Sequence, residues 1–84
     1  MELPDLHDFN RAVGEELRTA RARRRLTRPQ LAAISGVAVS TIQRFENGER
    51  SPDLTQLYTL CTALDISPQE ILTKSIEMVE GSGK

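Results

Sequence analysis

The 84-residue sequence contains a single cysteine, a single histidine and no tryptophan. One cysteine cannot form a disulfide within the chain, and His7 has no second imidazole or thiol near it in the sequence with which to bind zinc. Cys61 falls on a predicted apolar helix face, which favours a core thiol over a reactive one. The glycines are dispersed, so no phosphate-binding glycine loop is present. We therefore expect no metal, no cofactor and no enzymatic activity.

Long hydrophobic runs are also missing. No apolar stretch approaches the roughly 20 residues of a membrane span, and the opening residues, MELPDLHDFN, lack the basic and apolar regions of a signal peptide. With 38% hydrophobic and 27% charged residues, the composition is typical of one small globular domain. The sequence predicts a cytoplasmic protein without a membrane partner.

The formal net charge is only −1, but the charges are unevenly distributed. Residues 1–10 carry −3, residues 11–50 carry +5 from nine arginines and four glutamates, and residues 51–84 carry −3. Five of the arginines lie within RTARARRR, residues 18–25. A pI near 5.8 argues weakly against a nucleic-acid partner. The basic middle segment carries more weight, because binding to a polyanion depends on the local patch more than on the total charge.

Hydrophobic periodicity and capping residues predict five helices and no strand. The first helix covers about residues 8–24. The second begins after Thr27, which can form a capping box with Gln30, and it ends at Gly36. The third covers residues 39–46.

Two further helices are expected to begin at serine–proline pairs. Ser51 and Pro52 would open the fourth helix as its N-cap and first residue. Ser67 and Pro68 would open the fifth in the same way, with Glu70 completing a second capping box. The apolar sides of these helices and the first two carry the residues expected to face the core, which are Phe9, Val13, Leu17, Ala20, Leu31, Ala32, Leu54, Leu57, Cys61, Leu64, Ile71 and Leu72. Ile76 and Val79 extend the apolar side of the fifth helix.

The third predicted helix is amphipathic in an unusual way. On a helical wheel its apolar side carries Ala38, Ile42 and Phe45. Its other side offers small, amide and guanidinium groups where a surface helix would usually offer Glu and Lys. Such groups suit base edges in the major groove: an apolar side chain for thymine methyls, a hydroxyl, an amide for adenine and a guanidinium for guanine. The predicted base-contacting residues are Val39, Ser40, Gln43 and Arg44.

From about Val13 to Leu72 the sequence resembles the Xre/Cro/lambda-repressor type of helix-turn-helix domain. The matching positions include Leu17, Arg21, Leu31-Ala32, Gly36-Val37, Thr41-Ile42, Glu46-Asn47-Gly48, Pro52, Leu54, Leu57, Ala63-Leu64 and Ile66. The resemblance implies an all-α, compact five-helix domain whose second and third helices form the helix-turn-helix. We place an acidic leader at 1–8, the domain at 9–79 and a flexible tail at 80–84.

The resemblance also implies roles for individual residues. Arg21 and Glu46 are expected to form a structural ion pair that orients the third helix. The expected phosphate-contacting residues are Arg28, Thr41, Asn47 and Arg50. Asn47-Gly48 can equally be a plain helix C-cap, and both roles are compatible.

The sequence departs from the family pattern at three positions. Arg28 stands where the family often has a glutamine that touches the DNA backbone. Ala38 replaces a capping serine or threonine, and Arg25 replaces the glycine that commonly ends the first helix. For the remaining arginines of residues 18–25, which are Arg18, Arg23, Arg24 and Arg25, we expect a solvated basic face in preference to direct phosphate contact.

Two functions remain after these exclusions. One is a sequence-specific DNA-binding transcriptional regulator, a repressor or activator acting as a dimer on a palindromic operator. The other is an antitoxin that binds a toxin and autoregulates its operon. The segments outside the predicted helices are too short for a long toxin-binding arm, which favours the regulator. If these residues belong to a longer protein, a C-terminal sensor domain would make it a ligand-controlled repressor. We expect the homodimer to form through the apolar side of the fifth helix, at Ile71, Leu72, Ile76 and Val79.

Overall fold

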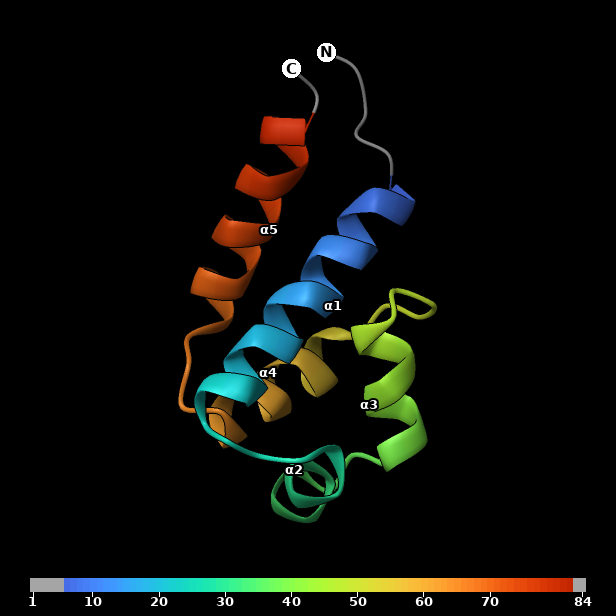
Figure 1. The fold of residues 1–84 in the computed structure, drawn as a ribbon, viewed down its shortest axis with the longest axis vertical. Coiled ribbons are helices and arrows are strands. Elements are labelled where there is room, and N and C mark those ends of the chain that lie inside the picture. The colour runs from blue at the N-terminus through green and yellow to red at the C-terminus, as the bar shows by residue number, and fades with distance from the viewer. Residues whose placement is uncertain (1–5, 83–84) are drawn as a thin grey trace.

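The computed structural model describes residues 6–82, which form five helices and no strand (Figure 1). The helices are α1 (Leu6–Arg23), α2 (Arg28–Ser35), α3 (Val39–Glu46), α4 (Leu54–Ala63) and α5 (Pro68–Ser82). The predicted all-α, five-helix fold is therefore confirmed.

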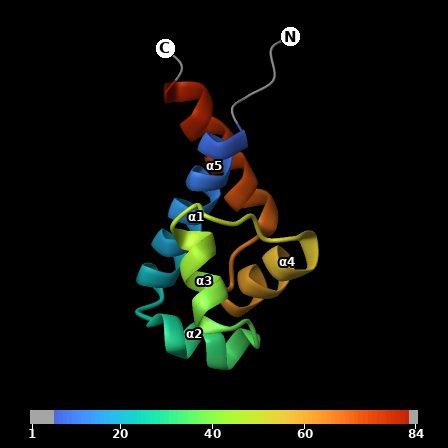
Figure 2. The same ribbon diagram turned by 90° about the vertical axis from the view of Figure 1, so that its right-hand side faces the viewer.

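The five helices form two groups, a pair of long helices and a cluster of three short ones. The two longest helices, α1 and α5, pack side by side, and the start of α1 lies near the end of α5 (Figures 1 and 2). The three shorter helices gather around the other end of α1, where α3 packs against both α1 and α2, and α4 packs against α2. This arrangement leaves one side of α3 facing outward, toward the viewer in Figure 2.

All five helices contribute side chains to one hydrophobic core. Its buried members are Val13, Leu17, Ala20, Leu31, Ile42, Phe45, Leu57, Leu60, Cys61, Leu64 and Ile71. Most were expected, but Leu54 is 82% exposed and was wrongly assigned to the core. It is the first residue of α4 and lies beyond the edge of the core, whereas Leu60, which was not expected, is buried.

The second helix begins and ends as its sequence predicts. Thr27 Oγ1 accepts a hydrogen bond from the Gln30 backbone N–H at 3.1 Å, and Gln30 Oε1 accepts one from the Thr27 N–H at 2.8 Å. Gly36 ends the helix with a left-handed φ of 78°. The capping box and the glycine C-cap are both confirmed.

The start of α4 differs from the prediction. Asp53, not Ser51, is the N-cap: its Oδ1 accepts from the Gln56 N–H at 2.7 Å, and its own N–H donates to Gln56 Oε1 at 3.0 Å. The physical reason is the capping-box spacing, since the residue three positions after Ser51 is Leu54, which has no side-chain acceptor.

The start of α5 agrees with the prediction only in part. Ser67 Oγ accepts from the backbone N–H of Gln69 at 3.1 Å, and Pro68 is the first helical residue, as expected. The predicted capping box is not formed, because the Glu70 N–H donates to the Ser67 backbone carbonyl at 3.0 Å and not to its hydroxyl. The Glu70 carboxylate forms an ion pair with Lys74 Nζ at 3.2 Å instead, an i,i+4 contact along the helix.

The first and last helices extend into the segments predicted as leader and tail. The helix α1 begins at Leu6, so part of the predicted leader 1–8 is helical, and α5 continues to Ser82, so part of the predicted tail 80–84 is helical as well. Gly81 lies within α5, since a single glycine weakens a helix by only about 1 kcal/mol and need not end it. Residues 1–5 and 83–84 lie outside the described part of the chain.

The turn between α1 and α2 uses an arginine where a glycine would be less strained. Arg25 has φ 57°, in the left-handed region, and the Leu26 N–H closes the turn onto the Arg21 carbonyl at 3.2 Å. A side chain in this conformation costs about 1–2 kcal/mol relative to the right-handed region. The turn therefore keeps the usual glycine geometry, at a cost in stability.

Candidate nucleic-acid interface

The outward side of α3 carries the side chains that the sequence predicts to contact bases. Ser40, Gln43 and Arg44 are exposed, and so is Val39, the first residue of the helix, at 39%. On the opposite side, Ile42 and Phe45 are buried in the core. The helix is thus held from behind while the predicted contact residues stay accessible.

Ala38 was expected on the apolar side of this helix and is exposed instead. It precedes the helix as its N-cap, with φ −63° and ψ 146°, so it does not follow the helical wheel. No side-chain hydrogen bond caps this end of α3. The missing serine or threonine therefore leaves a first-turn N–H group without an intrahelical or side-chain cap.

The last turn of α3 lies directly on the backbone of α1. A Cβ atom added at Gly14 would lie 2.1 Å from the Phe45 carbonyl oxygen and 2.9 Å from that of Glu46. Only glycine permits this approach. The sequence prediction missed its importance, although a glycine inside a long helix, where it weakens the helix by about 1 kcal/mol, was a signal for it.

The connection after α3 makes a second close contact with α1. Gly48 has φ 73°, and a Cβ atom there would lie 2.6 Å from Arg11 Cγ. The glycine is therefore required for both the left-handed turn and the space. Together with Gly14, it fixes the C-terminal end of α3 against the first half of α1.

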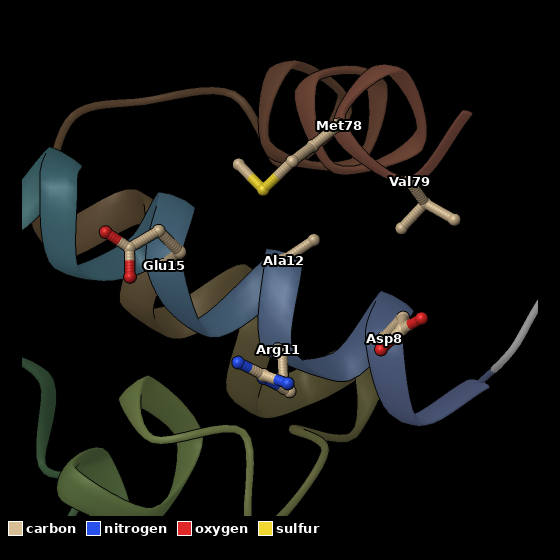
Figure 3. Close-up of a pocket in the computed structure, with 6 residues that line it drawn as sticks. All are labelled: Asp8, Arg11, Ala12, Glu15, Met78 and Val79. Carbon is tan, nitrogen blue, oxygen red and sulfur yellow. The ribbon is translucent and has the colours of Figure 1, made fainter. Parts of the chain in front are cut away.

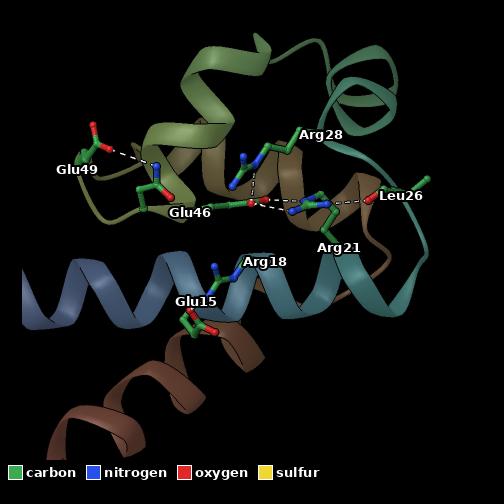
Figure 4. A network of polar contacts seen from close by, with 8 residues as sticks. Glu15, Arg18, Arg21, Leu26, Arg28, Glu46 and Glu49 are labelled. Atoms are coloured by element: carbon green, nitrogen blue, oxygen red, sulfur yellow. Dashed lines mark hydrogen bonds and ion pairs between the residues drawn. The ribbon is translucent and has the colours of Figure 1, made fainter.

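An ion pair joins the same end of α3 to α1 (Figure 4). Arg21 Nε donates to Glu46 Oε2 at 2.7 Å, and Arg21 Nη2 donates to Glu46 Oε1 at 2.9 Å. The remaining arm of the guanidinium donates to the Leu26 carbonyl at 2.9 Å. The structure thus brings Arg21 and Glu46 together in a bidentate contact with a carboxylate side chain that is only 1% exposed.

A second arginine binds the same carboxylate. Arg28 Nε donates to Glu46 Oε1 at 3.0 Å, and its side chain is 30% exposed (Figure 4). Arg28 was predicted to contact phosphate, and the prediction included no partner for it within the protein. Its position at the start of α2 gave no sequence signal of this contact, because the two residues are 18 positions apart.

The two arginines determine the charge state of Glu46. Burial alone would raise the pKa of this carboxyl group, but the hydrogen bonds from Arg21 and then Arg28 outweigh it, so the pKa is lower than usual. The hydrogen bond to Glu46 also raises the pKa of the Arg21 guanidinium. Glu46 is therefore ionised at neutral pH and stays bound to both arginines.

The rest of the RTARARRR segment serves structure more than expected. Arg18 pairs with Glu15 on the surface of α1. Arg24 Nε donates to the Leu64 carbonyl at 3.0 Å, and its Nη2 contacts Asp65 Oδ2 at 2.6 Å, so it binds the C-terminal end of α4. Arg23 and Arg25 are exposed and contribute to the basic surface.

The other predicted phosphate contacts lie on or just after α3. Thr41 is partly exposed on the helix, and Asn47 and Arg50 are exposed in the connection that follows. Asn47 ends α3 in a right-handed conformation and its Nδ2 donates to Glu49 Oε1 at 3.2 Å, while Gly48 takes the left-handed conformation. These residues flank the outward side of α3, and their contact with phosphate stays a prediction.

A cleft between α1 and α5 lies apart from this surface (Figure 3). Its lining residues are Asp8, Arg11, Ala12, Glu15, Met78 and Val79.

Across residues 6–82, no three His, Cys, Asp or Glu residues are grouped so that they could hold a metal ion. Cys61 is fully buried, and burial raises the pKa of its thiol to about 11, so it is not a thiolate at neutral pH.

Comparisons with known proteins agree on the kind of domain. The family model HTH_3, described as helix-turn-helix, matches residues 17–71. The HTH-type transcriptional repressor RghR of Bacillus subtilis is 41% identical over 65 residues, which cover 76% of this chain and 48% of that protein. The chain therefore spans about half the length of RghR.

Two further relatives match over most of their own length. The uncharacterized HTH-type transcriptional regulator y4dJ of Sinorhizobium fredii is 31% identical over 75 residues, which cover 89% of this chain and 97% of that protein. The crystal structure of the restriction-modification controller protein C.AhdI from Aeromonas hydrophila has a TM-score of 0.71 and 35% identity, covering 74% of this chain and 94% of that one. Within residues 6–82, no helix combines the length and apolar composition needed to cross a membrane.

Proposed function

This chain belongs to the helix-turn-helix family HTH_3, and on that basis we propose that it is a sequence-specific DNA-binding transcriptional regulator that reads the major groove with α3. The observation that carries the proposal is the outward side of α3, where Ser40, Gln43 and Arg44 are exposed on a helix held rigidly from behind. Such preorganised side chains can contact base edges without ordering a loop first. The relatives named as a transcriptional repressor and a transcriptional regulator support the same function.

Contacts to the DNA backbone would come from the residues around α3. Thr41, Asn47 and Arg50 can contact phosphates on either side of the groove, which positions the domain without reading sequence. The net charge of +5 in residues 11–50 would attract DNA at long range in a salt-dependent way. The proposal includes no enzymatic activity.

We extend the proposal to a two-fold homodimer, because one such domain contacts too few base pairs for the affinity that a regulator needs. A dimer on DNA must present two copies of α3 about 34 Å apart. Ile71 cannot contribute to the interface as expected, since it is fully buried against the core. Ile76 remains the main candidate, because it is 48% exposed on α5, with Leu72 and Val79 partly exposed beside it.

Selection from a pool of random duplexes by the purified protein tests the DNA-binding proposal. We expect enrichment of a two-fold symmetric motif. A matched variant, Gln43→Ala with Arg44→Ala, should keep its melting temperature, because both side chains are exposed, and should lose the motif. Failure of the unmodified protein to enrich any motif at low salt would contradict the regulator and favour the antitoxin.

Light scattering after size exclusion, with a duplex carrying the selected motif, tests the dimer. The unmodified protein should bind with two protomers per duplex, and Ile76→Asp should reduce this to one. Tyr58→Asp is the control, because Tyr58 is an exposed side chain on α4 rather than α5. One protomer per duplex in the unmodified protein would refute the dimer.

A further inference from the structure

Glu46 is the point at which three helices are joined by hydrogen bonds (Figure 4). Its Oε2 accepts from Arg21 at 2.7 Å, and its Oε1 accepts from both Arg21, at 2.9 Å, and Arg28, at 3.0 Å. Arg21 belongs to α1, Arg28 is the first residue of α2, and Glu46 is the last residue of α3. The network therefore connects the beginning of one helix of the helix-turn-helix to the end of the other.

The two arginines hold α3 in different ways. Arg21 ties the end of α3 to α1 and to the Leu26 carbonyl in the α1–α2 connection. Within the network, Arg28 is the residue that ties α3 directly to α2. The turn of residues 36–38 joins the two helices at their other ends, so the Arg28 contact closes the helix pair on the side opposite the turn.

This contact limits what else the Arg28 side chain can do. Its Nε is bound to a carboxylate that is 1% exposed, and the arginine itself is 30% exposed. Swinging the whole side chain outward would remove one of the three hydrogen bonds of a buried carboxylate, and such bonds to charged groups are among the stronger ones in proteins. Any phosphate contact would therefore have to come from the Nη groups while Nε stays bound to Glu46. The geometry favours an arginine that stays in place when DNA binds.

We propose that Arg28 is a positioning residue, which acts on DNA recognition through Glu46, by fixing α3 relative to α2, more than through any phosphate contact of its own. This inference rests on the proposed DNA-binding function. It replaces the sequence-based expectation for Arg28 and explains why an arginine here stabilises the reading helix as well as adding charge. Loss of the contact should reduce discrimination between DNA sequences more than general attraction to DNA.

The dependence of DNA binding on salt separates positioning from phosphate contact. Arg28→Gln and the control Arg50→Gln would each be titrated with the selected duplex and a scrambled duplex over a range of salt concentrations. A lost phosphate contact makes the negative slope of log K against log salt shallower by about 0.9, and it weakens binding to both duplexes alike. We expect that pattern for Arg50→Gln only. Arg28→Gln should keep the slope, weaken the selected duplex by roughly tenfold and leave the scrambled duplex nearly unchanged, since positioning affects the base contacts.

A double-mutant cycle tests whether Arg28 acts through Glu46. Arg28→Gln, Glu46→Gln and the combined variant would be measured for binding to the selected duplex and for thermal unfolding. If the inference is right, Arg28→Gln has little further effect on sequence discrimination once Glu46 is replaced, because contacting residues have non-additive effects. The salt measurement needs only Arg28→Gln, a change at a partly exposed side chain, so it remains decisive even where Glu46→Gln fails to fold.

Three results would overturn the inference. A slope reduced in Arg28→Gln as in Arg50→Gln would make Arg28 a phosphate contact. Additive effects in the cycle would show that Arg28 acts independently of Glu46. Failure of the unmodified protein to discriminate the selected from the scrambled duplex would refute the proposed function together with this inference, and it is recognised before any residue is changed.

Discussion

Gly14→Ala adds one methyl group at the place where α1 supports the reading helix. The new Cβ would lie 2.1 Å from the Phe45 carbonyl oxygen and 2.9 Å from that of Glu46, although real Cβ atoms essentially never approach another heavy atom within 3.0 Å. Both obstructing atoms belong to the backbone of α3, so no side chain can rotate out of the way. The end of α3 has to move away from α1, which also disturbs the Arg21–Glu46 contact.

Two effects of opposite sign set the magnitude. Overpacking of this kind costs about 1–3 kcal/mol, and the rigid backbone contact indicates the upper end. Alanine in place of glycine inside a helix recovers about 1 kcal/mol. We therefore expect a net loss of about 2 kcal/mol in the free energy of unfolding. For a domain of this size, each kcal/mol shifts the melting temperature by about 4–8 °C, so the loss corresponds to about 10 °C.

Thermal unfolding followed by circular dichroism measures this effect, with Gly81→Ala as a matched control. Gly81 also lies inside a helix, but a Cβ atom there meets nothing within 4 Å, so the same substitution should raise the melting temperature slightly. Binding to the selected duplex should weaken in Gly14→Ala and stay unchanged in Gly81→Ala. If both variants gain stability, α1 and α3 do not approach each other as the structure shows.

Four further predictions concern the ion-pair network, the α1–α2 turn and the reading side. Arg21→Ala should lower unfolding stability by about 3 kcal/mol, the lower end of the range for breaking a buried pair because Arg28 remains, and should weaken DNA binding as well; unchanged stability in denaturant unfolding would contradict the structural role. Arg25→Gly should raise stability in the same assay by about 0.5–1 kcal/mol, because glycine relieves the left-handed φ of 57°, and a loss would show that the turn is unstrained. Arg44→Ala should weaken specific binding by about 1–3 kcal/mol and relax preference at one base pair per half-site, whereas equal weakening on all sequences in competition assays would indicate a phosphate contact. The lowered pKa of Glu46 means that its contribution to stability is complete above its unfolded value of about 4.5 and is lost as the pH falls through the folded value, so melting curves of Glu46→Gln should lack that part of the acid loss seen in the unmodified protein.

Local sequence determined the helices and much of the predicted reading side. The capping box of Thr27 and Gln30 and the left-handed Gly36 depend on residues within a few positions of each other, so their spacing alone predicts them. The bounds of α3 and the burial of Ile42 and Phe45 follow from a helical period in the same way. Where two local patterns competed, as at Ser51 and Asp53, the helix began at the residue with a matching acceptor three positions later.

Only the tertiary structure decided how α3 is held. Arg28 and Arg21 reach Glu46 across 18 and 25 positions, and Arg24 reaches the end of α4 across 40. The approach of Gly14 to Phe45 likewise depends on how two helices cross. Periodicity indicates which face of a helix is apolar, but not which backbone or charged group lies opposite each residue. Those partners follow from the packing of all five helices around one core, because a single arrangement must satisfy every apolar face and every buried charge together.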